Sequence, residues 1–143
     1  MFVLAEGYWE MDVKPLFMSI DCISLKVADL ESAITFYTDK LGHELLWKTP
    51  TSAGLGFPNS NSELVIHSEP RPPGTDLLVE SVPDGIERLG EAGGKLVFGP
   101  IDIPVGLFAI VSDPWDNQLN ILDLSKGLYK VDENKNVIGV DAG

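Results

Sequence analysis

Asp113-Pro-Trp-Asp-Asn-Gln-Leu-Asn-Ile-Leu-Asp-Leu124 is the stretch of this chain that decides the fold. Its first five residues, 113 to 117, form a cluster rich in turn formers, and a short apolar run follows them. One amide, Asn120, interrupts the apolar run. The pattern predicts a turn followed by a strand, in which Asn120 either satisfies a backbone group or hydrogen-bonds a ligand.

The composition limits the classes of protein to which the chain can belong. Its 143 residues suit one domain, 44% of them are hydrophobic, and no apolar run approaches the roughly 18 residues of a membrane span. A formal net charge of -12 would repel nucleic acid. The single cysteine, Cys22, is typical of a reducing compartment, and the first 17 residues lack a secretory pattern. We therefore expect a cytoplasmic protein that binds neither nucleic acid nor membranes.

Residues 18–69 carry the pattern of one strand, one helix and three more strands. Apolar residues alternate with polar or small ones from Cys22 to Val27, which predicts a strand with one apolar face and one mixed face. Asp29 can cap a helix whose apolar stripe runs to Leu41, and Gly42 can supply its left-handed exit. Strand-like runs follow at 44–48, 53–57 and 63–67.

Residues 76–126 repeat this order after a stiff, proline-rich connector at residues 70–75. Residues 77–82 predict a strand, and Asp84 with Glu87 predicts the start of a helix that ends at Gly93. Further strands are expected at 95–98, 107–112 and 118–123. The chain therefore contains two copies of one unit of about 50 residues.

The two ends of the chain fall outside this repeat. Residues 1–17 show no clean periodicity and are either an N-terminal arm or a leader. Residues 127–143 contain two short strand patterns around Asp-Glu-Asn-Lys-Asn, which predicts a hairpin tail that covers the sheet or contacts a partner.

Residues 20–42, Ile-Asp-Cys-Ile-Ser-Leu-Lys-Val-Ala-Asp-Leu-Glu-Ser-Ala-Ile-Thr-Phe-Tyr-Thr-Asp-Lys-Leu-Gly, closely resemble the opening of the vicinal oxygen chelate superfamily. This superfamily includes glyoxalase I, extradiol dioxygenases and bleomycin-resistance proteins. Residues 113–124 resemble its closing motif, usually Asp-Pro-x-Gly-Asn followed by a strand. The resemblance implies an α+β fold of two βαβββ modules, whose curved mixed sheets form a cup with the helices outside. It says little about the substrate, because the superfamily supports many chemistries.

The resemblance also implies where a metal would bind. In metal-dependent relatives up to four His or Glu ligands line the cup, from the first and last strands of each module. The corresponding positions are Cys22, His67, a residue near Gly74, and Asn120, with Asp76 reached only by a register shift. His67 alone is an ordinary strong ligand, whereas catalytic metal sites normally use three. We therefore expect no metal and no cofactor.

Seven residues are candidates for contact with a small organic ligand in the cup. They are Cys22, Trp47, Phe57, His67, Phe108, Trp115 and Asn120. Structural roles are the alternatives: Cys22 as a small buried residue, His67 as a hydrogen-bonded one, and Trp115 as a packing or dimer contact.

We expect a metal-independent protein of the glyoxalase and bleomycin-resistance type that sequesters an apolar or aromatic ligand, and the resemblance implies a homodimer. The alternative is a divergent lyase, isomerase or dioxygenase-like enzyme. Such an enzyme would use His67 as a base or an atypical metal at Cys22 and His67.

Overall fold

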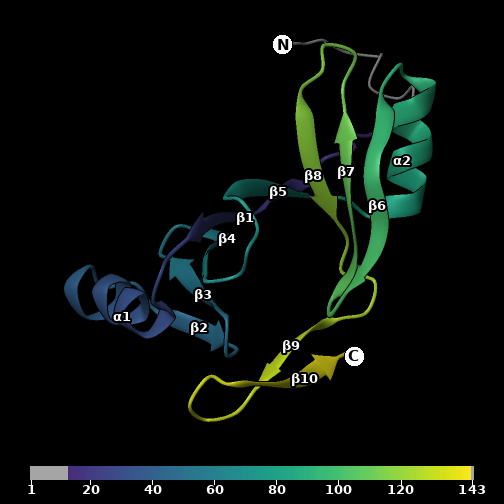
Figure 1. Cartoon of the computed structure of the whole chain (residues 1–143). Coiled ribbons are helices and arrows are strands. Elements are labelled where there is room, and N and C mark those ends of the chain that lie inside the picture. Colours follow the sequence, from purple (N-terminus) through teal and green to yellow (C-terminus); the bar gives the residue numbers. More distant parts are fainter. Residues whose placement is uncertain (1–12, 143) are drawn as a thin grey trace.

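Two halves of the chain with the same order of elements build one mixed sheet (Figure 1). The computed structural model describes residues 13–142. In chain order the elements are β1 (Ser19–Lys26), α1 (Leu30–Thr35), the π-helical turn η2 (Phe36–Lys40), β2 (Leu45–Lys48), β3 (Ser52–Phe57), β4 (Ser60–His67), β5 (Gly74–Leu78), α2 (Val82–Glu91), β6 (Lys95–Ile103), β7 (Gly106–Ser112), β8 (Gln118–Leu122), β9 (Leu128–Val131) and β10 (Val137–Asp141).

The strand order shows the repeat directly. Within the described residues the main sheet has eight strands in the order β2-β3-β4-β1-β5-β8-β7-β6. In each half the first strand pairs in parallel with the last one, β1 with β4 and β5 with β8, and the remaining pairs are antiparallel. The halves join through the antiparallel pair of β1 and β5. The predicted α+β fold with two βαβββ modules is therefore confirmed, although the curved sheet stays open and the cup does not close.

Each module has its own apolar core between the sheet and its helix. In the first module, Leu30 and Ile34 of α1 pack against Leu55 and Ile66. In the second, Val82 of α2 belongs to a buried cluster with Val79, Ala109, Val111 and Ile121. Burying one such side chain stabilises the fold by about 1.5–3 kcal/mol, so each helix is held on the outer face of its own module.

The start of α2 differs from the prediction. Ser81 caps the helix, and its hydroxyl accepts a hydrogen bond from the Asp84 backbone N–H at 3.2 Å. Pro83 fits the first turn because no intrahelical partner exists there for a backbone N–H. The predicted start at Asp84 and the strand prediction for residues 77–82 were therefore wrong, since β5 ends at Leu78 and the helix begins at Val82.

The turn and strand predicted for residues 113–124 are confirmed. Asp113 closes the turn by accepting hydrogen bonds from the backbone of Trp115 and Asn117, both at 2.9 Å. Hydrogen bonds from Asn117 also hold the pKa of the Asp113 carboxyl below its usual range. β8 follows at Gln118. At its end the buried Asp123 accepts hydrogen bonds from the backbone N–H groups of Val82 at 2.8 Å and Leu107 at 2.9 Å.

β9 and β10 form a separate two-stranded antiparallel sheet. Figure 1 shows that this hairpin leaves the second module near the β6–β7 connection. Its turn then reaches the first module, where the Lys48 N–H donates to the Lys135 carbonyl at 2.8 Å. The suggested arm or leader at residues 1–17 lies mostly outside the described residues. Within residues 13–142 no helix is both long and apolar enough to span a membrane.

Candidate functional site

A cavity of about 750 Å³ lies on the inner side of the sheet. Its walls are mainly apolar, and they come from both modules and from the C-terminal hairpin. The first module contributes Leu46, Trp47 and Val65, the second contributes Ile101, Ile103 and Phe108, and the hairpin contributes Leu128, Tyr129 and Val131. A cavity of this size and lining is typical of a small-molecule site.

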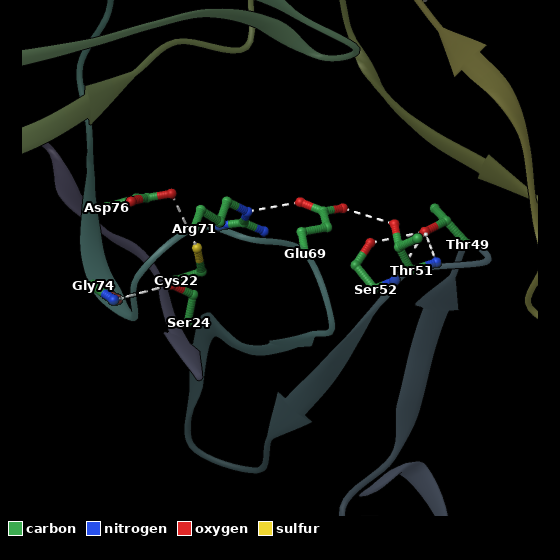
Figure 2. A network of polar contacts seen from close by, with 9 residues as sticks. All are labelled: Cys22, Ser24, Thr49, Thr51, Ser52, Glu69, Arg71, Gly74 and Asp76. Atoms are coloured by element: carbon green, nitrogen blue, oxygen red, sulfur yellow. Dashed lines mark hydrogen bonds and ion pairs between the residues drawn. The ribbon is translucent and has the colours of Figure 1, made fainter. Parts of the chain in front are cut away.

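The strand register brings four polar side chains together in the middle of the sheet. Cys22 of β1 lies opposite Glu63 of β4 and Asp76 of β5, and Asp76 lies opposite Asn120 of β8. The Cys22 thiol donates to Asp76 Oδ2 at 3.5 Å, and Figure 2 shows the two side chains pointing toward one another. The Asn120 amide donates to Asp76 Oδ1 at 3.2 Å. Asp76 is therefore the centre of this polar group.

A β-bulge adds Asp21 to the cavity lining. The register between β1 and β5 shifts between Ile20 and Cys22, so that the adjacent residues Asp21 and Cys22 both line the cavity. Burial, together with the negative charge of Asp76, raises the pKa of Asp21. The same two causes raise the pKa of the Cys22 thiol far above its ordinary value. Cys22 is therefore a protonated and weakly nucleophilic thiol at neutral pH.

Glu63 is the second carboxyl whose pKa is raised. Burial is the main cause, and the charge of Asp21 adds to it. The indole N–H of Trp47 donates to Glu63 Oε1 at 2.8 Å, which favours the ionised form but does not offset burial. Trp47 is thereby fixed against the floor of the cavity, and its ring lies directly over Gly54, where a Cβ atom would overlap the indole.

Glu69 and Arg71 form an ion pair at one side of the cavity (Figure 2). Arg71 Nε lies 2.7 Å from Glu69 Oε1, and the Thr51 hydroxyl donates to Glu69 Oε2, also at 2.7 Å. Burial opposes ionisation of Glu69, but the hydrogen bonds from Arg71 and Thr51 outweigh it and lower the pKa. Among the described residues that line the cavity, Arg71 is the only one with a cationic side chain, against four carboxyl groups.

Three of the seven predicted ligand contacts line this cavity, namely Cys22, Trp47 and Phe108. The structure places Asn120 next to them, against Asp76, although its side chain is not part of the lining. Trp115 is 78% exposed in the turn between β7 and β8, at the opposite end of these strands from the β6–β7 connection. Phe57 ends β3, where its ring lies 6.0 Å from that of His43.

His67 lies at the end of β4, with 0% of its surface exposed and outside the cavity lining. Neither ring nitrogen has a hydrogen-bond partner within the described part of the chain. Burial, with a contribution from the charge of Arg71, lowers the pKa of His67. His67 is therefore a neutral buried side chain at neutral pH.

Asp21, Glu63, Asp76 and Tyr129 line the cavity but were not among the predicted contacts. The sequence could assign Asp76 to the position opposite Cys22 only if the register between the two strands were shifted. The observed register has that shift, since Asp76 lies opposite Cys22 and Gly74 lies opposite Ser24. The expected position near Gly74 was therefore wrong. The alternation of Glu63 and Val65 with Leu64 was the available signal for Glu63.

The donor atoms in and near the cavity do not fit a metal centre of the kind used by metal-dependent relatives. Cys22 lies opposite Glu63, so His67 is four residues further along the strand, about 13 Å away at about 3.3 Å per residue. One metal ion cannot bind both Cys22 and His67 at that separation. In residues 13–142 no three His, Cys, Asp or Glu side chains are grouped so that they could hold an ion.

Comparison with known proteins identifies similar folds. The family described as "Glyoxalase/Bleomycin resistance protein/Dioxygenase superfamily" matches residues 19–121. Methylmalonyl-CoA epimerase from Mycobacterium tuberculosis is 20% identical, with a TM-score of 0.61 over 82% of this chain and 95% of that chain. The Mn(II)-bound glyoxalase from Novosphingobium aromaticivorans is 22% identical, with a TM-score of 0.52 over 75% of this chain and 38% of that chain. No curated protein sequence gives a significant match. At these identities the structural similarity shows the fold alone.

Proposed function

Because the chain belongs to the glyoxalase/bleomycin resistance protein/dioxygenase superfamily, we propose that its cavity binds a small organic molecule without a metal ion. The observation that carries the proposal is the cavity of about 750 Å³, which has apolar walls and a carboxyl-rich floor. Cavities of roughly 300–1,000 Å³ with mostly apolar linings are typical ligand sites. The protein would sequester an apolar or aromatic ligand.

The apolar walls favour an aromatic ligand. Trp47 and Tyr129 form an aromatic pair at the cavity, with ring centroids 4.8 Å apart, and Phe108 lines the cavity from the second module. Aromatic side chains contribute large contact areas and preferred ring geometries to such sites. A planar ligand would therefore be bound by ring contacts and burial.

The carboxyl groups that line the cavity favour a neutral or cationic ligand over an anionic one. Asp21, Glu63, Glu69 and Asp76 all line the cavity, and Arg71 is already paired with Glu69. An anion would approach these carboxyl groups in a partly desolvated site, where like charges repel more strongly than in water.

Neither Cys22 nor His67 supports the enzymatic alternative, in which His67 is a base or the two residues share a metal ion. A nucleophile or general base must reach the bound molecule in a reactive protonation state. The Cys22 thiol has a strongly raised pKa, and His67 does not line the cavity. A shared metal at these two residues is ruled out by their separation along the strands.

Fluorescence titration with two matched dyes tests the proposal. Phenylnaphthylamine is neutral, whereas anilinonaphthalene sulfonate has the same ring system with an added anionic group. We expect the neutral dye to bind at one site per chain and at least about tenfold more tightly than the sulfonate. Equal or tighter binding of the sulfonate would contradict the charge argument, and no binding of either dye would contradict the proposal.

A pair of substitutions locates the dye. Ile103→Trp fills the cavity wall, whereas Ile23→Trp makes the same change at an exposed residue of β1 outside the lining. We expect Ile103→Trp to weaken dye binding at least about tenfold and Ile23→Trp to leave it unchanged. Equal effects of both substitutions would place the dye elsewhere.

The proposal includes a homodimer. β6 is an edge strand of the sheet, and Leu96, Val97 and Phe98 are exposed on it. Exposed apolar edge strands favour pairing with another chain. Analytical ultracentrifugation should show a dimer that Val97→Lys shifts towards monomer, and a monomeric wild-type protein would refute this part.

A cytoplasmic location completes the proposal. It is supported by the free, buried thiol of Cys22, which is typical of a reducing compartment. Fractionation of cells that express the full chain tests the location, and recovery outside the cytoplasm would refute it.

A further inference from the structure

The C-terminal hairpin is a wall of the cavity that the family match does not cover. The match ends at residue 121, whereas β9 begins at Leu128. Nevertheless Leu128, Tyr129 and Val131, all from β9, line the cavity. Part of the binding surface therefore comes from a segment outside the two matched modules.

The hairpin is attached to the first module by few contacts. Its backbone meets the main sheet through the bridge between Lys48 and Asn136, where the Lys48 N–H donates to the Lys135 carbonyl. The other contacts are apolar: Tyr129, Val131 and Val137 pack against the buried cluster of Cys22, Trp47 and Val65. The apolar contacts between the hairpin and the first module therefore lie beside the cavity, which Tyr129, Val131 and Trp47 all line.

The hairpin has a turn that is stabilised by its own residues. Asp132 Oδ1 accepts hydrogen bonds from the backbone N–H of Asn134 at 2.8 Å and from that of Asn136 at 2.9 Å. Lys135 adopts a positive φ of 69°, as the turn requires. The turn of the hairpin is therefore stabilised within the hairpin, whereas its apolar side chains pack against the first module.

The two rings of the aromatic pair differ in how firmly they are held. Trp47 is buried, donates its indole N–H to Glu63 and lies over Gly54. Tyr129 is half-buried and comes from the hairpin. Burial, with the charges of Glu69 and Glu63, raises the pKa of its phenol, so the side chain is neutral at neutral pH.

We propose that the β9–β10 hairpin is the specificity-determining wall of the cavity and that Tyr129 is its ligand-contacting residue. The ring of Tyr129 would pack against an aromatic group of the ligand beside Trp47. This inference rests on the proposed function, because it concerns the same cavity. It adds that a segment outside the matched family region selects the ligand.

Three substitutions on β9 test the inference with phenylnaphthylamine as the probe. Tyr129→Phe keeps the ring, Tyr129→Ala removes it, and Lys130→Ala changes the next, exposed residue. We expect Tyr129→Ala to raise the Kd of the dye at least about tenfold and the other two to change it less than about twofold. Thermal unfolding of each variant shows whether the fold is retained.

Amide hydrogen exchange of the wild-type chain gives a second readout that needs no substitution. Saturation with the dye should slow exchange at least about fivefold in 128–131 and 137–141, since a bound ligand bridges the hairpin to the first module. Unchanged exchange there, or dye affinity unchanged by Tyr129→Ala, would overturn the inference while the proposed function stands. If the wild-type chain does not bind the dye at all, the proposed function fails and this inference fails with it.

Discussion

Replacing Asp123 with alanine should destabilise the second module strongly. Asp123 is only 2% exposed, and its carboxylate accepts hydrogen bonds from the backbone N–H groups of Val82 and Leu107. It also accepts from the hydroxyl of Ser125 at 2.7 Å. One side chain thus connects the start of α2, strand β7 and the chain that follows β8.

The expected loss follows from the groups left without a partner. Each buried backbone N–H that loses its acceptor costs about 1–3 kcal/mol, so Asp123→Ala should lower the free energy of unfolding by about 4 kcal/mol. Asp123→Asn keeps one carbonyl oxygen but cannot accept at both positions, and we expect a loss of about 2 kcal/mol. Total stabilities of about 5–15 kcal/mol make both losses large.

Urea denaturation at neutral pH, followed by circular dichroism, measures these losses. Glu80→Ala, which removes an exposed carboxylate, is the control and should change the free energy of unfolding by less than about 0.5 kcal/mol. A loss below about 1 kcal/mol for Asp123→Ala would refute the role assigned to this carboxylate.

The same residue predicts a pH dependence of known sign. Burial alone would raise the pKa of Asp123, but its hydrogen bonds from Val82, Ser125 and Leu107 outweigh burial and lower it. Its stabilisation is therefore present above the unfolded pKa of about 3.9 and is lost as the pH falls through the lower folded pKa. The stability difference between wild type and Asp123→Asn should shrink in acid, and a constant difference would contradict this origin.

Three further predictions concern the polar residues in and near the cavity. Asp21→Asn should raise the melting temperature at neutral pH, because burial and the charge of Asp76 disfavour its ionised form; a lower melting temperature would argue against that burial. The pKa of His67 is lower in the folded chain than its unfolded value of about 6.5, so the free energy of unfolding falls as the pH drops below about 6.5 and the unfolded chain takes up a proton. The difference in this free energy between wild type and His67→Leu should therefore change across that pH range. A thiol-reactive disulfide reagent should label Cys22 at least about tenfold more slowly in the native protein than in urea, and equal rates would show an accessible thiolate.

The sequence was sufficient for the fold because local patterns define it. The turn around Asp113 uses residues whose side chains hydrogen-bond the adjacent backbone, and Gly42 has the positive φ of 78° expected at a helix exit. The alternation along β1 placed Cys22 and Ser24 on one face and Ile23 on the other, but it did not show that the mixed face is the buried one and that Ile23 is exposed. Turns, helix ends and strand faces can be predicted because each depends on residues that are close together in the sequence.

The site could be predicted only in part because it depends on register between distant strands. Alternation assigns Glu63 and His67 to one face but does not say which lies opposite Cys22. The bulge that adds Asp21 leaves no clear pattern in the sequence either. For Tyr129, the tail gave a hairpin pattern without showing which surface it would cover.

Calorimetric titration of phenylnaphthylamine, before and after exhaustive chelation and again after addition of manganese, measures whether the cavity binds a small molecule without a metal ion. If the cavity binds by burial and ring contacts, as proposed, titration should show one site per chain with the same Kd, within about twofold, under all three conditions. The absence of binding, or binding that disappears on chelation and returns with manganese, would contradict the account.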